Sequence, residues 1–218
     1  MHDYAVARHN MVESQIRANN VTDPAIVDAF QAVPRELFVP KQARGIAYVD
    51  EDLPLGGGRF LMEPMVFARL LMMAEIGPDD LVLDVGGATG YGAAVLARLA
   101  AAVVAVEENE ELAKTATETL SGLGVDNAVV VEGPLTEGYP KQAPYNVIVI
   151  EGGVEEIPSA LREQLADGGR LVAVVRSERG VGKATLFQSR GGGFSGRAVF
   201  DAATPVLPGF AKQPGFVF

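Results

Sequence analysis

The chain has 218 residues, a formal net charge of −10 and no cysteine. Its length fits one domain with a short extension, and the lack of cysteine excludes disulfides, thiolate zinc sites and thiol catalysis. The acidic balance argues against a nucleic-acid partner, because duplex binding needs concentrated Lys and Arg. No apolar run has the length of a signal-peptide core or a membrane helix, so we expect a cytoplasmic protein.

Residues 1–75 are predicted to form a helical N-terminal extension. Helical spacing of apolar residues extends over Val6–Ile16 and Asp23–Phe30. Asp23 ahead of Pro24 is typical of a helix start. Glycines 56–58 predict a flexible turn, and Pro64–Ala74 predicts another helix.

Residues 76–218 are predicted to form an α/β unit that is compact with the extension. Strands are expected at 81–85, 103–106, 128–131, 146–150, 171–175, 183–189 and 196–202, and helices at 91–100, 110–120 and 159–165. Alternation of strands and helices implies right-handed βαβ units. The last two strands are expected to pair antiparallel, because glycines 191–193 make a short hairpin connection. The predicted fold is therefore a Rossmann-like, doubly wound, mainly parallel seven-stranded sheet with an antiparallel C-terminal pair.

The most informative stretch is the glycine-rich turn between the first of these strands and its helix. It contains Asp84, Gly86, Gly87, Thr89 and Gly90. Glycine lets the backbone bend at positive φ and lets a ligand approach closely, and the N–H groups at the following helix start face that ligand. The turn therefore predicts a nucleotide site.

A second feature supports that site. The next strand ends in Glu107, about 20 residues after the first glycine, where an acid accepts hydrogen bonds from a ribose diol. The alternative for Glu107 is a solvated charge at the start of the next helical region. Because the glycine turn and Glu107 have the sequence spacing of such a site, we favour the ribose role for Glu107.

The dinucleotide loop of short-chain dehydrogenases is also similar to residues 87–90. Against it, the loop lies near the middle of the chain, and Ala93 stands where the third glycine would fall. No Tyr is followed four positions later by the Lys that those enzymes need. Asp84 inside the strand suits a methyltransferase better.

Further along the chain, the order of motifs resembles the protein-L-isoaspartate O-methyltransferase family over nearly the whole length. The matching segments are Met11–Arg17, Val33–Pro40, Ala47–Tyr48, Leu53–Gly56, the glycine turn, Val104–Glu107, Ala143–Asn146 and Asp167–Leu171. The resemblance implies S-adenosylmethionine as cofactor and an isoaspartyl protein or peptide, or a small molecule, as acceptor. It also implies that a carboxylate attacks the methyl carbon. A carboxyl ionises near pH 4, so it needs no general base at neutral pH.

The resemblance places the acceptor side at Met62 and Glu63. In the family a Ser or Thr at the position of Met62 orients the substrate carboxylate, whereas methionine cannot donate a hydrogen bond. Glu63 would repel an incoming carboxylate if it faced the site, or else it simply begins the helix opened by Pro64. Arg59 could bind a carboxylate instead, although a solvated loop cation is the simpler interpretation.

The resemblance also places the adenine beside Gly133. The family has Asp after this glycine, and here Pro134 offers neither a carboxylate nor an N–H. Adenine recognition is then expected to fall to neighbouring backbone such as that of Leu135. Ala88, usually Gly in the family, is small enough for the turn. We assign no metal site and no role to His2 or His9.

Three functions remain open at this stage. The first is isoaspartyl carboxyl methylation, which the resemblance favours. The second is methylation of another acceptor, suggested by Met62 and Glu63. The third is a non-catalytic protein that binds the nucleoside, suggested by the departures at Met62, Ala88 and Pro134. A nicotinamide dehydrogenase is the alternative from another class.

Overall fold

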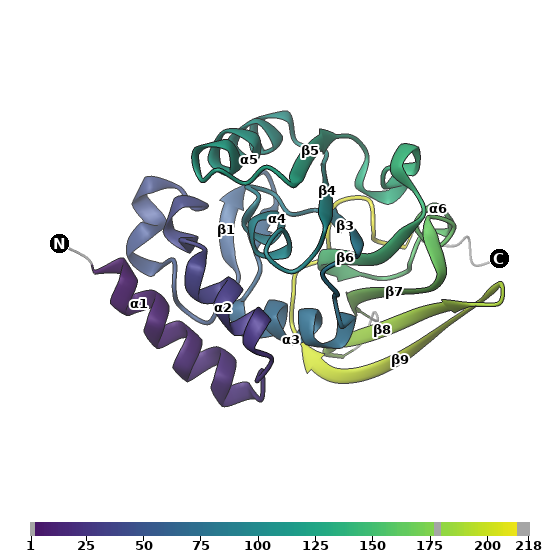
Figure 1. Cartoon of the computed structure of the whole chain (residues 1–218), viewed down its shortest axis with the longest axis horizontal. Helices are drawn as coiled ribbons and strands as arrows, with labels where there is room; N and C mark the ends of the chain where they lie inside the picture. Colours follow the sequence, from purple (N-terminus) through teal and green to yellow (C-terminus); the bar gives the residue numbers. More distant parts are fainter. Residues whose placement is uncertain (1–2, 177–179, 213–218) are drawn as a thin grey trace.

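The computed structural model describes residues 3–176 and 180–212. A seven-stranded sheet occupies one part of the molecule, and the N-terminal helices lie at the opposite side (Figure 1). The segments in chain order are α1 (Tyr4–Met11), η1 (Val12–Ile16), η2 (Arg17–Asn19), α2 (Pro24–Ala32), η3 (Arg35–Leu37), η4 (Lys41–Ile46), β1 (Leu53–Gly56), β2 (Arg59–Leu61), α3 (Pro64–Ala74), β3 (Leu81–Val85), α4 (Tyr91–Leu96), β4 (Ala102–Glu107), α5 (Glu110–Gly122), β5 (Ala128–Glu132), η5 (Leu135–Glu137), η6 (Pro140–Gln142), β6 (Tyr145–Val154), α6 (Ser159–Arg162), β7 (Leu165–Val175), β8 (Gly182–Arg190) and β9 (Gly193–Ala202).

The strand order is β5-β4-β3-β6-β7-β8-β9, parallel from β5 to β7 and antiparallel at β8 and β9. The predicted fold class is confirmed. β3 lies between β4 and β6, so the winding reverses there and the carboxyl ends of these three strands meet at one edge. Ligands of doubly wound sheets bind at this edge.

Alternation along the strands divides the core into two clusters. Val82, Val103 and Val147 face α1–α4, whereas Leu83, Val104 and Ile148 face the other side of the sheet. On that second side, α6 and the segment after β9 provide Leu161, Leu207 and Phe210. The first cluster contains residues from both predicted parts of the chain, so the extension and the sheet share a core.

The segment after β9 is held to β6 by its backbone. Gly153 N donates to Pro205 O at 2.7 Å, and Leu207 N donates to Gly153 O at 2.9 Å. In Figure 1 this yellow segment returns from β9 toward the upper strands. These bonds fix Leu207 near the carboxyl end of β6.

Several predicted bounds need correction. Helix 6–16 is α1 followed by a π-helical turn, helix 91–100 ends at Leu96, and helix 159–165 ends at Arg162. The last helix stops early because Leu165 already pairs with Tyr145 in the sheet. The glycines at 56–58 join a two-stranded hairpin, β1–β2, that the sequence analysis missed. His2 lies outside the described residues.

Candidate active site

The glycine turn after β3 has the backbone that only small residues tolerate. Gly86 and Gly90 have φ of 83° and 89°, in the left-handed region that glycine enters without cost. At Gly87 a Cβ atom would overlap the Asp84 carboxylate. The turn therefore needs glycine for its shape, and it leads directly into α4 at Tyr91.

The side chain of Glu107, at the end of β4, is hydrogen-bonded to this turn. Its carboxylate accepts hydrogen bonds from Ala88 N and from Asn109 N, each at 3.0 Å. The side chain is only 1% exposed, so the alternative of a solvated charge is wrong. The sequence prediction that Glu107 lies beside the turn agrees with this placement, and its role toward a ribose stays a prediction.

Arg59 lies inside the site, contrary to the prediction from sequence. The interpretation as a solvated loop cation is wrong, because Arg59 is 2% exposed. Its Nη1 donates to both carboxylate oxygens of Glu107, at 2.5 and 2.7 Å, and its Nη2 donates to Gly86 O. The hairpin β1–β2 thus places a buried ion pair at the carboxyl end of β4.

A second buried acid lies close to Asp84. The carboxyls of Asp84 and Glu151 are within hydrogen-bonding reach of each other, and both side chains are buried. Burial raises the pKa of Glu151 to about 7, and burial followed by the charge of Glu151 raises the pKa of Asp84 well above its usual range. Two adjoining buried carboxyls cannot both ionise readily, so the pair retains a proton. The sequence analysis missed Glu151; a lone acid directly after the apolar run of β6 was the available signal.

The N-terminal extension holds the turn in place. Thr89 Oγ1 donates to Phe38 O at 2.6 Å, so this hydroxyl ties the turn to the extension. Arg35, which is fully buried, donates through Nε to Ala47 O and through Nη2 to Met62 O, each at 2.7 Å. The motif at residues 33–40 therefore supports both the turn and the backbone on the acceptor side.

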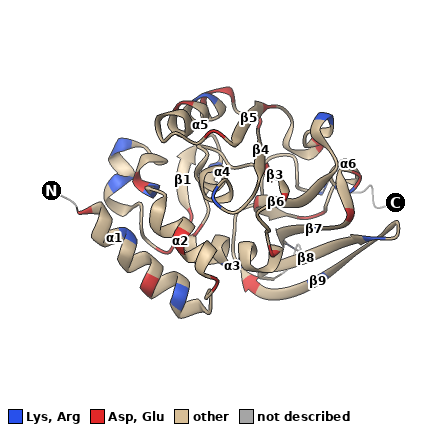
Figure 2. Ribbon diagram, viewed as in Figure 1, with Lys and Arg blue, Asp and Glu red and all other residues tan. Residues whose placement is uncertain are grey.

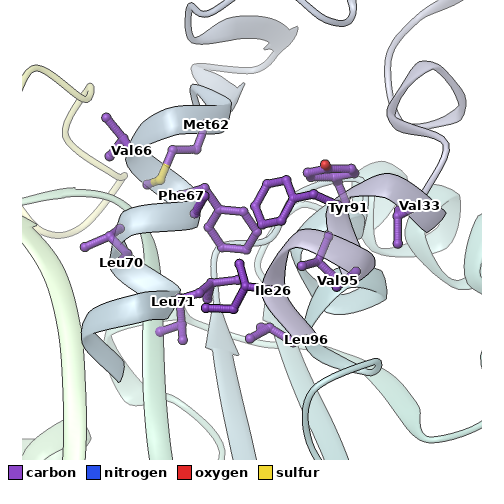
Figure 3. Packing of buried hydrophobic residues seen from close by; sticks show 14 of the residues in the cluster. Ile26, Val33, Met62, Val66, Phe67, Leu70, Leu71, Tyr91, Val95 and Leu96 are labelled. Carbon is purple, nitrogen blue, oxygen red and sulfur yellow. The ribbon is translucent and has the colours of Figure 1, made fainter. Parts of the chain in front are cut away.

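Met62 lies in apolar surroundings and is 2% exposed. Figure 3 shows its side chain beside Val66 of α3, in the cluster that also contains Phe67 and Tyr91. It also lines a small cavity, together with Glu151 and Leu207. The position predicted for the acceptor hydroxyl is thus part of a cavity wall, in which the one hydroxyl belongs to Thr204 rather than to residue 62.

Glu63 is the N-cap residue of α3, in agreement with the interpretation that it begins this helix. Its N–H donates to Asp52 Oδ1 at 2.8 Å. The side chain is half-buried, and burial together with Asp50, Asp52 and Glu51 raises the pKa of Glu63 to about 7. Its predicted role at the acceptor side stays a prediction.

The region predicted for adenine lies beyond Glu107. Gly133 N donates to Glu107 O at 3.1 Å, which places the end of β5 beside the end of β4. Pro134 precedes the turn η5, and the side chain of Leu135 is buried in the second cluster. The side chain of Leu135 is therefore not available to a base, and the role of its backbone in adenine recognition stays a prediction.

The turn, Glu107 and the end of β5 fit a nucleoside by the chemistry of their donors and acceptors. The space over Gly86, however, is filled by this chain. A Cβ at Gly86 would meet Arg59 Nη2 at 3.0 Å and Leu207 Cδ1 at 3.1 Å. A nucleoside that approached Gly86 from this side would meet both side chains.

Among the described residues, no group of three or more His, Asp or Glu could hold a metal ion, and no helix is long and apolar enough to cross a membrane. Lys and Arg are scattered over many elements in Figure 2 rather than gathered on one.

Comparison with known proteins gives a consistent result. The model of the family Protein-L-isoaspartate(D-aspartate) O-methyltransferase matches residues 6–199. A protein-L-isoaspartate O-methyltransferase of Methanoculleus marisnigri is 45% identical over 168 residues, which are 77% of this chain and 76% of that protein. One of Rhodopseudomonas palustris is 39% identical over 81% of this chain and 72% of that protein.

Solved structures agree with the fold. A protein-L-isoaspartate O-methyltransferase has a TM-score of 0.81 at 27% identity, covering 93% of this chain and 66% of that one. A putative enzyme of the same name from Plasmodium falciparum, in complex with S-adenosyl-L-homocysteine, has a TM-score of 0.78 at 16% identity, covering 95% of this chain and 99% of that one.

Proposed function

Because the chain belongs to the protein-L-isoaspartate O-methyltransferase family, we propose that it methylates the side-chain carboxylate of isoaspartyl residues in proteins and peptides. Membership in this family confirms two predictions, that the chain is a methyltransferase and that S-adenosylmethionine is its cofactor. It favours this function over another acceptor, a non-catalytic protein or a dehydrogenase. The observation that carries the proposal is the family match over residues 6–199, joined to a buried acid beside the glycine turn.

We assign the cofactor to the glycine turn and to the carboxyl ends of β4 and β5. Glu107 would accept the ribose hydroxyls, and the backbone of Gly86, Gly87 and Gly90 would leave room for the nucleoside. The Asp84 carboxylate occupies the space where a side chain at residue 87 would lie, so it helps to fix the shape of the turn. The backbone of Gly133 and Leu135 would contact the base. When bound, the cofactor supplies an electrophilic methyl group.

The chain itself has little covalent chemistry to perform. A new C–O bond forms between the acceptor carboxylate and the methyl carbon as the C–S bond breaks, and the sulfur leaves with the electron pair. The carboxylate is already ionised at neutral pH, so no residue must remove a proton. The residues of the site must hold the two reactants in line, which can lower the barrier substantially.

An assay with a matched peptide tests this function. The chain is incubated with radiolabelled S-adenosylmethionine and a peptide that contains one L-isoaspartyl residue, beside the same peptide with aspartate. We expect base-labile methyl esters on the isoaspartyl peptide only. Equal labelling of both peptides, or none above the blank, would contradict the proposed acceptor.

A further inference from the structure

Arg59 occupies the groups that the cofactor needs. Its Nη1 donates hydrogen bonds to both oxygens of the Glu107 carboxylate, and its Nη2 donates to the carbonyl oxygen of Gly86. The ribose diol would bind the same carboxylate through two donated hydrogen bonds. Arg59 and the ribose therefore compete for Glu107.

The competition is also steric. Arg59 Nη2 and Leu207 Cδ1 lie 3.0 and 3.1 Å from an ideal Cβ position at Gly86, which is closer than an ordinary van der Waals contact. A nucleoside that approaches Gly86 from this side would have to displace the guanidinium from the turn. Binding of the cofactor would then break a buried ion pair.

The displaced guanidinium then requires another anion. A buried cation without a partner is costly, and Nε of Arg59 already has no hydrogen-bond partner among the described residues. A carboxylate matches the planar donor fork of arginine, which can hold both of its oxygens.

Gly58 and Phe60, the neighbours of Arg59 in the chain, line the cavity that also contains Met62. The charge of Arg59 acts on Glu151, whose pKa it lowers in opposition to burial, and Glu151 lines the cavity together with Met62 and Leu207. Leu207 also contacts the Gly86 position beside Arg59. Met62 offers no hydrogen to an acceptor carboxylate, and the one hydroxyl among the residues that line this cavity is that of Thr204.

We propose that Arg59 is the carboxylate receptor of the acceptor site and is made available by the cofactor. It pairs with Glu107 until the ribose takes that carboxylate, and it then binds the side-chain carboxylate of the isoaspartyl residue. This inference rests on the proposed function for the identity of the acceptor. It makes Arg59 the specificity-determining residue that replaces the hydroxyl absent at Met62.

The exchange couples the two ligands. If the cofactor frees the cation that the acceptor needs, each ligand raises the affinity for the other by the same factor. In the unaltered chain we expect an isoaspartyl peptide to bind at least about tenfold more tightly when S-adenosylhomocysteine is present. Equal peptide affinity with and without this nucleoside, measured by calorimetry, would overturn the proposal.

Substitution of Arg59 should change the affinities for the nucleoside and for the peptide in opposite directions. Arg59→Met keeps a long side chain and removes the charge. Without an ion pair to break, S-adenosylhomocysteine should bind at least about tenfold more tightly, whereas the peptide should bind the nucleoside complex at least about tenfold more weakly. Arg59→Lys should retain part of the peptide affinity. Arg197→Met, an exposed arginine of β9, is the matched control and should change neither affinity.

The outcomes separate the possible failures. Weaker or unchanged nucleoside binding in Arg59→Met would overturn the competition, and unchanged peptide binding would overturn the receptor role. If Arg59→Met does not fold, the coupling in the unaltered chain still decides. An absence of methyl ester in the turnover assay contradicts the proposed function, whereas the nucleoside affinities report on Arg59 independently of turnover.

Discussion

The carboxyls of Asp84 and Glu151, from neighbouring parallel strands, lie within hydrogen-bonding reach of each other in the interior of the molecule. Neither side chain is exposed by more than 5%. Parallel pairing of β3 with β6 brings the two acids to one edge, and removal of water from both favours the protonated form. This pair makes the stability of the chain depend on pH.

Stability should fall as the pH rises from about 4.5 to about 7. In the unfolded chain a glutamate ionises near pH 4.3, whereas burial raises the pKa of Glu151 to about 7 in the folded chain. Between these values the unfolded state binds fewer protons, so unfolding becomes easier as the pH rises. The loss from Glu151 is on the order of 2–3 kcal/mol.

Glu151→Gln should flatten this dependence and be more stable than the unaltered chain at pH 7.5. Urea unfolding followed by circular dichroism at several pH values measures it. Glu118→Gln, at an exposed position of α5, should keep the original slope. An identical slope in Glu151→Gln would show that the acid pair does not titrate in this window.

Gly92→Ala should destabilise the chain, although alanine normally stabilises a helix interior by about 0.5–1 kcal/mol relative to glycine. A Cβ at Gly92 would overlap Glu151 Oε1, and such overpacking costs about 1–3 kcal/mol. In the background of Glu151→Ala the same change should become stabilising. A double-mutant cycle by chemical unfolding measures the coupling, and additive effects would argue against this contact.

Met62→Ser should lower the stability of the chain and raise its activity on the isoaspartyl peptide. The side chain is buried in the first cluster, so its truncation should lower the free energy of unfolding by about 2–4 kcal/mol. The new hydroxyl adds a donor to the cavity wall, and kcat/KM should rise roughly tenfold. Met62→Ala makes a similar cavity without a hydroxyl and is the control. A rise in both variants would point to space rather than hydrogen bonding.

Ala88→Gly should stabilise the chain by about 0.5–1 kcal/mol. Ala88 has φ of 48°, and this left-handed conformation costs a non-glycine residue about 1–2 kcal/mol. Glycine avoids this cost, but it loses more conformational entropy on folding, which offsets part of the gain. Ala5→Gly, at an exposed position of α1, should lower stability by about 1 kcal/mol. Thermal unfolding of the pair measures the opposite signs; destabilisation in both would mean that Ala88 is unstrained.

The central elements were predictable because their signals are local. The apolar run of β3, the glycines after it and the acid at the end of β4 occupy adjacent stretches of sequence. Their chain order and their resemblance to a family were enough to predict the nucleotide site. The hairpin β1–β2 was missed because its strands are short and its glycines predicted only a turn.

The contacts that fill the site depend on residues far apart in the chain. Arg59 meets Glu107 across 48 positions, and Leu207 reaches Gly86 from the segment after β9. No periodicity links such residues, so a loop arginine was interpreted as solvated. Only the packing of the hairpin against the sheet shows that it is buried.

The position of Leu207 has a consequence for the newly synthesised chain. The glycine turn and Glu107 are synthesised 100 or more residues before Leu207, so the early part of the sheet emerges without one of the two side chains that cover Gly86. The cover over Gly86 is therefore complete only when the last segment of the chain has paired with β6.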